Sequence, residues 1–254
     1  MIRTLLAVLA LASLFSSHAL AGSTCPEHFL GGQSPALAVP AGAVELCSDT
    51  FATLWSPETR DPVYSAEHLT PAALIGADKT ARLNAFHADD RLPRSVRAEL
   101  SDYAGGAFDR GHMAPAHDMP TPEAMRQSFV LSNMVPQNPA NNRGVWAHVE
   151  EFTRRLVVLA KEAYVVTGPI FEGAPKRLNG RVAIPFRIWK AVYVPPSQFN
   201  PDGQVGAYVV ANTAEAVPEI ISLDGLKALT GIDAFPVLSD RDRARADLPA
   251  VAPR

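Results

Sequence analysis

The sequence predicts an α+β fold in which a mixed or antiparallel sheet is flanked by helices. Three observations support this class. Short β-rich segments lie before residue 72, a strongly periodic helix follows near the middle of the chain, and β-rich segments return after it. Strands that precede and follow a helix in this way are typical of the α+β class.

The first half of the chain is expected to contribute short elements. Residues 22–47 are rich in Gly and Pro and should form an irregular lead-in. After a mixed, polar stretch at residues 72–104, Pro115 and Pro120 prevent a long helix, and Pro136 closes a strand. In order, we expect β-segments at 51–55 and 62–64, a helical turn at 94–100, an extended segment at 109–112, a short helix at 123–128 and a strand at 129–135.

The second half begins with the clearest helix, predicted over residues 143–163. Its apolar residues recur at intervals of three and four, as on one buried face of a helix: Val145, Val149, Phe152, Leu156 and Leu159. The pattern then predicts strands at 163–167, 181–194 and 206–211 and a short helix at 223–229. The charged, Pro-containing residues 239–254 are expected to form a flexible tail, so that residues 22–238 make up a single domain.

The first 21 residues have the features of a secretory signal peptide. Arg3 supplies a positive charge, residues 5–15 form an apolar run too short to span a bilayer, and residues 19–21 form an A-x-A cleavage site. An N-terminal membrane anchor is the alternative. We expect a mature chain that starts at Gly22, is secreted or periplasmic, and does not insert into a membrane.

Cysteine content and charge limit the kinds of site that this chain can carry. Behind a signal peptide, the two cysteines, Cys25 and Cys47, predict one disulfide, with two unrelated thiols as the alternative. They cannot supply a four-cysteine zinc site. The net charge is −3, and −4 once Arg3 is removed. Because proteins that bind nucleic acid usually carry a basic face, any contact with phosphate must here be local.

The first chemically informative segment is Asp109–His112, with the sequence D-R-G-H. Phosphodiester hydrolysis requires a base that takes a proton from water and positive charge that stabilises the transition state. His112 is a candidate base because the unperturbed pKa of histidine lies near neutrality. On an extended strand Arg110 and His112 share a face, and Gly111 between them lets the backbone come close. By itself, this segment is equally compatible with a structural histidine.

A second polar segment lies where the predicted helix begins. Asn142 is at its start, and Glu150 follows two helical turns later along one stripe. One amide oxygen with several ordered waters suits Mg²⁺, which prefers oxygen ligands and gives up its waters reluctantly. By itself, Asn142 is more simply interpreted as the N-cap of the helix.

Together these segments resemble the DNA/RNA non-specific endonuclease family of the ββα-metal nucleases. D-R-G-H at Asp109–His112, N-x-x-P-Q at 133–137 and N-x-G-x-W-x-x-x-E at 142–150 follow in the family's order and spacing. The similarity extends over residues 25–238. It implies a ββα-metal nuclease core with a central sheet flanked by helices.

The resemblance also implies roles for individual residues. His112 would be the general base, and Asn142 the sole protein ligand of a Mg²⁺ ion, for which Mn²⁺ is an expected substitute. Glu150 would orient the water shell of the metal, and Arg110 would position the phosphate. Asn133 would support either His112 or that water shell.

The family has a further arginine upstream, before an aromatic residue and an aspartate, which would stabilise the charge of the transition state. Arg82, followed by Phe86 and Asp89, fits this pattern, with Arg91 as the alternative.

The implied activity is hydrolysis of DNA and RNA with little sequence preference, giving 5′-phosphate ends. Contacts that read the phosphate backbone rather than base edges account for both properties. Two other classes remain open: a nucleic-acid-binding or toxin-like protein without catalysis, and a phosphodiesterase for small substrates or lipids. A monomer and a homodimer are both compatible with the sequence.

Overall fold

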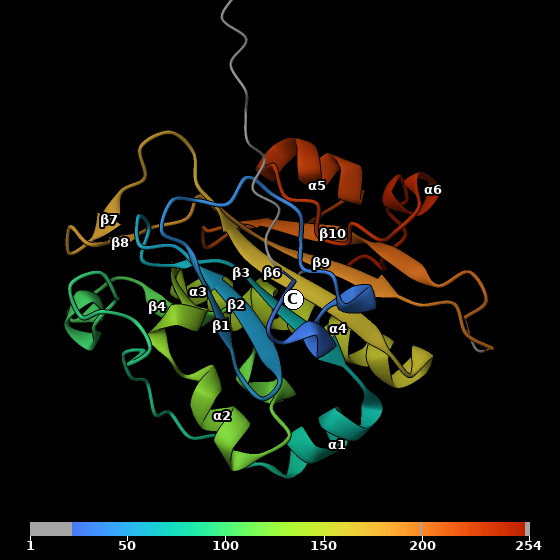
Figure 1. The fold of residues 1–254 in the computed structure, drawn as a ribbon, viewed down its shortest axis with the longest axis horizontal. Helices are drawn as coiled ribbons and strands as arrows, with labels where there is room; N and C mark the ends of the chain where they lie inside the picture. The colour runs from blue at the N-terminus through green and yellow to red at the C-terminus, as the bar shows by residue number, and fades with distance from the viewer. Residues whose placement is uncertain (1–21, 199, 252–254) are drawn as a thin grey trace, which may run out of the picture.

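The protein is built around a seven-stranded sheet, seen in a computed structural model that describes residues 22–198 and 200–251 (Figure 1). The strand order is β1-β2-β3-β6-β9-β10-β11, and each neighbouring pair is antiparallel. The strands are β1 (Val44–Cys47), β2 (Phe51–Trp55), β3 (Pro62–Leu69), β6 (Ala163–Ile170), β9 (Arg187–Val194), β10 (Gln204–Ala211) and β11 (Glu219–Ile221). The predicted α+β class is confirmed, with an antiparallel sheet. The predicted signal peptide at residues 1–21 lies outside the described residues.

Helices cover both faces of this sheet (Figure 1). Successive residues of a strand point to opposite faces, so Val165 packs toward α1 (Pro71–Lys79) and α4 (Ala147–Ala160), whereas Val166 packs toward α5 (Leu223–Thr230). The remaining α-helices are α2 (Pro122–Ser128), α3 (Pro139–Asn141) and α6 (Asp240–Arg243). No helix in the described part of the chain is long and apolar enough to span a membrane.

A separate hairpin joins β4 (Asp109–His112) to β5 (Met134–Gln137) and leads into α4, which makes a ββα unit. We expected the second strand at residues 129–135, but it begins only at Met134, because residues 131–133 form a 3-10 turn. Pro136 lies inside β5 and not after it. The hairpin has only two strands, so the N–H group that proline lacks is needed by no further neighbour.

The central helix is shorter and less regular than its periodicity predicted. A π-helical turn occupies Asn142–Trp146, where Gly144 has non-helical backbone angles, and regular α-helix runs only to Ala160. Lys161 then adopts a left-handed conformation that ends the helix. Leu159, which we assigned to the buried face, is 69% exposed.

Three segments differ from expectation because their packing partners are distant in the sequence. The polar stretch after residue 71 contains α1, which starts with Pro71 and is capped by the Thr70 hydroxyl accepting from Ala73 N. The lead-in contributes β1. In the C-terminal segment that we expected to be a flexible tail, Leu248 and Val251 are buried in the apolar cluster beneath α4, whereas the other described residues are exposed or half-buried.

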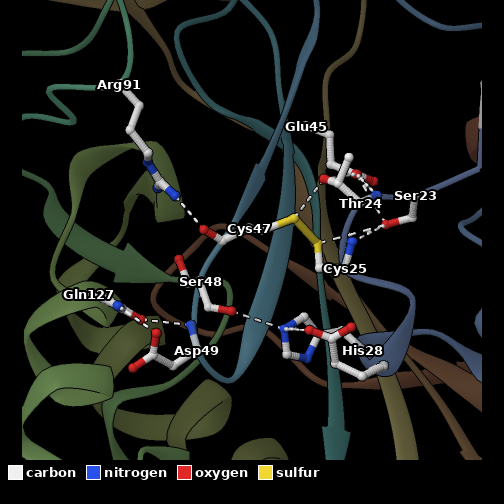
Figure 2. The surroundings of a disulfide bond; sticks show 11 residues. Ser23, Thr24, Cys25, His28, Glu45, Cys47, Ser48, Asp49, Arg91 and Gln127 are labelled. Carbon is white, nitrogen blue, oxygen red and sulfur yellow. Dashed lines mark hydrogen bonds and ion pairs between the residues drawn. A yellow bond between two sulfur atoms is a disulfide. The ribbon is translucent and has the colours of Figure 1, made fainter.

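The predicted disulfide is present and ties the N-terminal segment to the edge of the sheet. Cys25 precedes a short 3-10 turn, and Cys47 is the last residue of β1 (Figure 2). The carbonyl of Cys47 also accepts a hydrogen bond of 2.6 Å from Arg91 Nη1. The disulfide therefore lies where the N-terminal segment, the sheet and the loop before β4 meet.

Replacing both cysteines by serine (Cys25→Ser/Cys47→Ser) should lower the free energy of unfolding by roughly 3 kcal/mol, because the disulfide restricts the unfolded chain. Urea denaturation checks this value. The wild-type protein in excess reductant should approach the stability of the double variant. Equal midpoints for oxidised wild type and variant would contradict a stabilising role.

Candidate active site

One surface cleft, with a volume of about 470 Å³, brings together most of the predicted site residues. It is lined by Arg82, Arg110, His112, Asn142 and Glu150, together with residues from the loops around them. These residues come from the loop after α1, from β4, from the π-helical turn and from α4. Asn133 and Arg91 do not line it.

His112 lies at the end of β4, and the backbone around it is closely packed. Arg110 and His112 share one face of the strand, as predicted, and Gly111 faces the other way toward Gln137. A Cβ atom on Gly111 would come within 2.0 Å of Oε1 of Gln137. The close approach that we expected at this glycine is therefore made to a neighbouring strand.

The His112 ring is almost completely buried between aromatic side chains. Its centroid is 4.9 Å from that of Phe129 and 5.8 Å from that of Phe86. Burial, and after it the positive charges of Arg82, His117 and Arg110, lowers the pKa of His112 to about 3. The ring is therefore neutral, and its Nε2 atom makes no hydrogen bond within the described part of the chain. As a neutral imidazole, the ring can accept a proton.

The same aromatic pair also carries the two cleft arginines. The guanidinium carbon of Arg110 is 4.0 Å from the Phe86 ring centroid, and that of Arg82 is 5.1 Å from the Phe129 centroid. Stacking on aromatic faces holds a guanidinium while leaving its N–H donors free for an anion. Two cations are thus held beside His112.

Arg82 and Arg91 are separated by the fold. Arg91 forms two hydrogen bonds to the Asp89 carboxylate and contacts Cys47 instead of the cleft. Asp89 is also held by the hydroxyl of Ser132. Of the two upstream arginines, only Arg82 is in a position to meet a phosphate next to His112.

Asn142 is oriented by Asp109, the first residue of β4. Its Nδ2 donates to Asp109 Oδ2 at 3.0 Å, and Arg143 makes two further hydrogen bonds to the same carboxylate. Because Nδ2 is used in this way, Oδ1 remains as a free oxygen acceptor in the cleft. The N-cap interpretation of Asn142 is excluded, since Asn138 caps this segment by accepting from Ala140 N.

Glu150 lies in the first turn of α4 and lines the same cleft. Burial raises its pKa to about 7, against the opposing effect of Lys190 and Arg154. Trp146, which lies between Asn142 and Glu150 in the sequence, is fully buried in the core. Of the predicted stripe, Asn142 and Glu150 line the cleft and Trp146 does not.

The donor set of the cleft fits a hard divalent cation. A free amide oxygen and a carboxylate are oxygen donors of the type that Mg²⁺ binds. Among the described residues, the one group of three His, Cys, Asp or Glu side chains with metal-binding spacing is Cys25, Glu45 and Cys47. Its thiols form the disulfide. The residues that would hold an ion in the cleft are therefore Asn142, directly, and Glu150 and Asp109 around it.

Asn133 is fully buried and acts on the backbone after His112. Its Oδ1 accepts from Ala114 N and from the Ser65 hydroxyl, and its Nδ2 donates to the carbonyls of Ala114 and Ser128. With every polar atom of its side chain used, Asn133 holds the segment that follows His112 and does not reach the cleft.

A buried polar layer beneath α4 was missed in the sequence. Glu67 of β3 and Lys190 of β9 point to the face of the sheet that α4 covers and are each 1% exposed. Lys190 Nζ donates to the Thr167 hydroxyl at 2.7 Å, whereas neither carboxylate oxygen of Glu67 has a hydrogen-bond partner within the described residues. Burial, together with the charge of Asp118, raises the pKa of Glu67 well above its usual range. The signal in the sequence was a charged residue, Lys190, within a segment expected to be a strand.

Glu67→Gln should stabilise the protein at alkaline pH. A carboxyl whose pKa is raised by folding contributes stability below its unfolded pKa and loses it as the pH rises through the folded value. Gln does not ionise, so the Tm of the variant should match wild type in acid and exceed it in alkali, by about 2–4 °C for each kcal/mol. Thermal melts across a pH series measure this. A variant that is less stable in alkali would mean that ionised Glu67 supports the fold.

Comparison with known proteins assigns the chain to a family. A family model described as DNA/RNA non-specific endonuclease matches residues 33–241, which include the whole cleft. The chain belongs to this endonuclease family. The ββα unit of β4, β5 and α4 lies within the residues that this model matches.

Individual relatives are nucleases from several kinds of organism. The chain is 33% identical to the mitochondrial nuclease EXOG of Xenopus laevis, over 76% of this chain and 58% of the relative. It is 36% identical to Nuclease C1 of Cunninghamella echinulata var. echinulata, over 65% and 70% respectively. It is 37% identical to a nuclease of Nostoc sp., over 60% of each chain. This endonuclease-family chain thus spans little more than half the length of the Xenopus relative.

A solved structure shares the fold. In a crystal structure of an EndoG/EndoGI complex, one chain superimposes with a TM-score of 0.69 at 21% identity, covering 82% of this chain and 92% of that chain. The overall fold of this chain is therefore one that a solved structure also has.

Proposed function

We propose that this chain is a metal-dependent endonuclease that hydrolyses the phosphodiester bonds of DNA and RNA with little sequence preference. The observation that carries the proposal is the meeting in one cleft of a neutral imidazole, that of His112, and a free amide oxygen, Oδ1 of Asn142. Several cleft residues, including Arg82, His117 and Arg143, are exposed, so the site opens onto the surface. An open site suits a polymer better than a small molecule.

Each side chain has a defined task in this reaction. Arg82 and Arg110 bind the phosphate and neutralise its charge, and the neutral His112 ring accepts a proton from the attacking water. A bound phosphate would offset the charge of the arginines that lower the pKa of His112, and so make this ring a stronger base. Glu150 orients water in the cleft. Asn142 would hold a divalent cation such as Mg²⁺ or Mn²⁺, which would supply Lewis-acid stabilisation of the leaving 3′ oxygen.

These tasks account for the breadth of substrates that we propose. None of them uses the 2′-hydroxyl group or a base edge, so one site serves both RNA and DNA. The products are 5′-phosphate and 3′-hydroxyl ends. We also propose that the mature chain is secreted or periplasmic, which the disulfide supports because such bonds persist in oxidising compartments.

Metal removal tests the proposal. Protein starting at Gly22 is incubated with supercoiled plasmid and with RNA, in Mg²⁺, in Mn²⁺ and in EDTA. Both substrates should be degraded with either metal and remain intact in EDTA. Binding without cleavage would instead indicate a nucleic-acid-binding protein, and cleavage of small diesters alone would indicate a small-substrate phosphodiesterase.

A further inference from the structure

Residues 172–187, which contain β7 (Arg177–Leu178) and β8 (Val182–Ala183), form a hairpin with an unusual charge. It carries four basic side chains and one acidic one, a net charge of +3 in a chain of net charge −3. Arg181 pairs with Asp102 at 2.7 Å and Arg187 with Glu172 at 3.6 Å. Lys176 and Arg177 are exposed, and neither has an ion pair with a carboxylate in the described part of the chain.

This basic hairpin packs against the wall of the cleft. Leu178 and Val182 form an apolar cluster with Tyr103 and Phe108, which both line the cleft. In Figure 1 the hairpin lies at the same end of the molecule as β4, whereas α6 lies at the opposite end. The apolar side chains of the hairpin therefore pack behind the cleft wall, at the end of the molecule where β4 lies.

Phe186 adds an aromatic surface next to the segment that carries Asn142. It is 50% exposed, and it is the one aromatic among the large apolar side chains that are exposed in the described residues. Its backbone is rigid, since its N–H donates to Ile170 O and its carbonyl accepts from Asn212 N. Asn212 also donates to the carbonyls of Pro136 and Pro185 and accepts from Asn138 N.

We propose that the basic hairpin is an accessory binding surface for a single-stranded part of the nucleic acid, next to the bond that is cut. Lys176 and Arg177 contact its phosphates, and an unpaired base stacks on Phe186. The guanidinium carbon of Arg187 already lies 5.4 Å from the Phe186 ring centroid. Exposed aromatic rings and cations on one surface are the elements from which sequence-tolerant single-strand sites are built. The proposal rests on the proposed function, because that function makes nucleic acid the occupant of the adjoining cleft.

Binding to a non-cleaving protein tests this surface. In a His112→Ala background, fluorescence anisotropy measures the affinity for a labelled single strand, for its duplex and for a dinucleotide too short to reach the hairpin. Phe186→Ala should weaken single-strand binding about 5- to 100-fold and leave duplex binding much less affected. Lys176→Ala/Arg177→Ala should weaken both polymers and lower the single-strand salt slope by about 1.4, or about 0.7 for each phosphate contact.

Matched controls are available on the far side of the molecule and on another helix. Arg241→Ala on α6 removes an exposed cation, and Leu159→Ala on α4 removes an exposed apolar side chain; both should bind the single strand like the background. Unchanged single-strand affinity in folded Phe186→Ala and Lys176→Ala/Arg177→Ala proteins would overturn the inference. That outcome would leave metal-dependent cleavage intact, whereas a failure of the proposed function would appear as no cleavage by the wild-type protein.

Discussion

His112→Ala should lower the rate of plasmid and RNA cleavage by on the order of 10²–10⁴-fold. The variant loses the neutral imidazole of the cleft, whose Nε2 atom is buried and has no hydrogen-bond partner in the described residues. Because this nitrogen makes no hydrogen bond, its removal should cost little stability beyond the loss of packing against Phe86 and Phe129. Initial rates at saturating metal, with thermal melts as a folding check, measure both effects.

His117→Ala is the matched control. His117 lines the same cleft but is exposed and does not stack on the aromatic pair. It should retain most of the activity. Added imidazole should partly restore cleavage by His112→Ala, because it can supply the missing base. Full activity in His112→Ala would rule out its assignment as the general base.

Asn142→Ala should abolish metal-dependent cleavage and strongly weaken Mg²⁺ binding, since it removes the free amide oxygen of the cleft. Titration calorimetry measures the metal affinity without requiring turnover. Asn142→Asp keeps an oxygen at the same position but loses the hydrogen bond to Asp109 and places two carboxylates side by side, so it should weaken Mg²⁺ binding less than Asn142→Ala does. Asp109→Ala leaves that oxygen in place but releases the amide, so it should weaken binding by about 10- to 100-fold, as for residues that orient a metal ligand. Wild-type affinity in Asn142→Ala would place the metal elsewhere.

The Asn142 segment also illustrates why helix prediction succeeded only in part. Apolar spacing correctly indicated a long helix packed on the sheet, because the spacing reflects which side chains are buried. It could not reveal the π-helical turn at Asn142–Trp146, since that irregularity depends on Gly144 and on the Asp109 contacts from a distant strand. The turn brings Asn142 to Asp109 while Trp146 stays in the core.

The sequence predicted some residues of the cleft and left others ambiguous. His112, Arg110, Asn142 and Glu150 stand in short motifs, and the structure brings them together in one cleft. Their roles remain proposals until the variants are measured. The sequence motif could not decide whether Arg82 or Arg91 is the upstream arginine of the site. In the structure Arg91 forms an ion pair with Asp89, and only Arg82 lines the cleft.

Two features of the structure, the buried residues of the C-terminal segment and the buried polar layer beneath α4, could not be predicted from the sequence. Residues 239–251 have a charged composition that predicts flexibility, yet Leu248 and Val251 fill an apolar surface formed by β-strands far away in the sequence. Glu67 and Lys190 are 123 positions apart but share one face of the sheet. Both features depend on contacts between residues that are far apart in the chain, so a short stretch of sequence does not reveal them.

The sequence by itself determined the α+β class, the disulfide pair, the family motifs and the residues that we propose for the chemistry. Each of these depends on residue type and short-range spacing, which the chain carries directly. Only the tertiary structure decided that Arg82 and not Arg91 faces the cleft, that Asp109 orients Asn142, and that Phe86 and Phe129 hold His112 between the arginines. These features depend on contacts between segments tens of residues apart, whose free energy is gained only when the sheet and the ββα unit pack together.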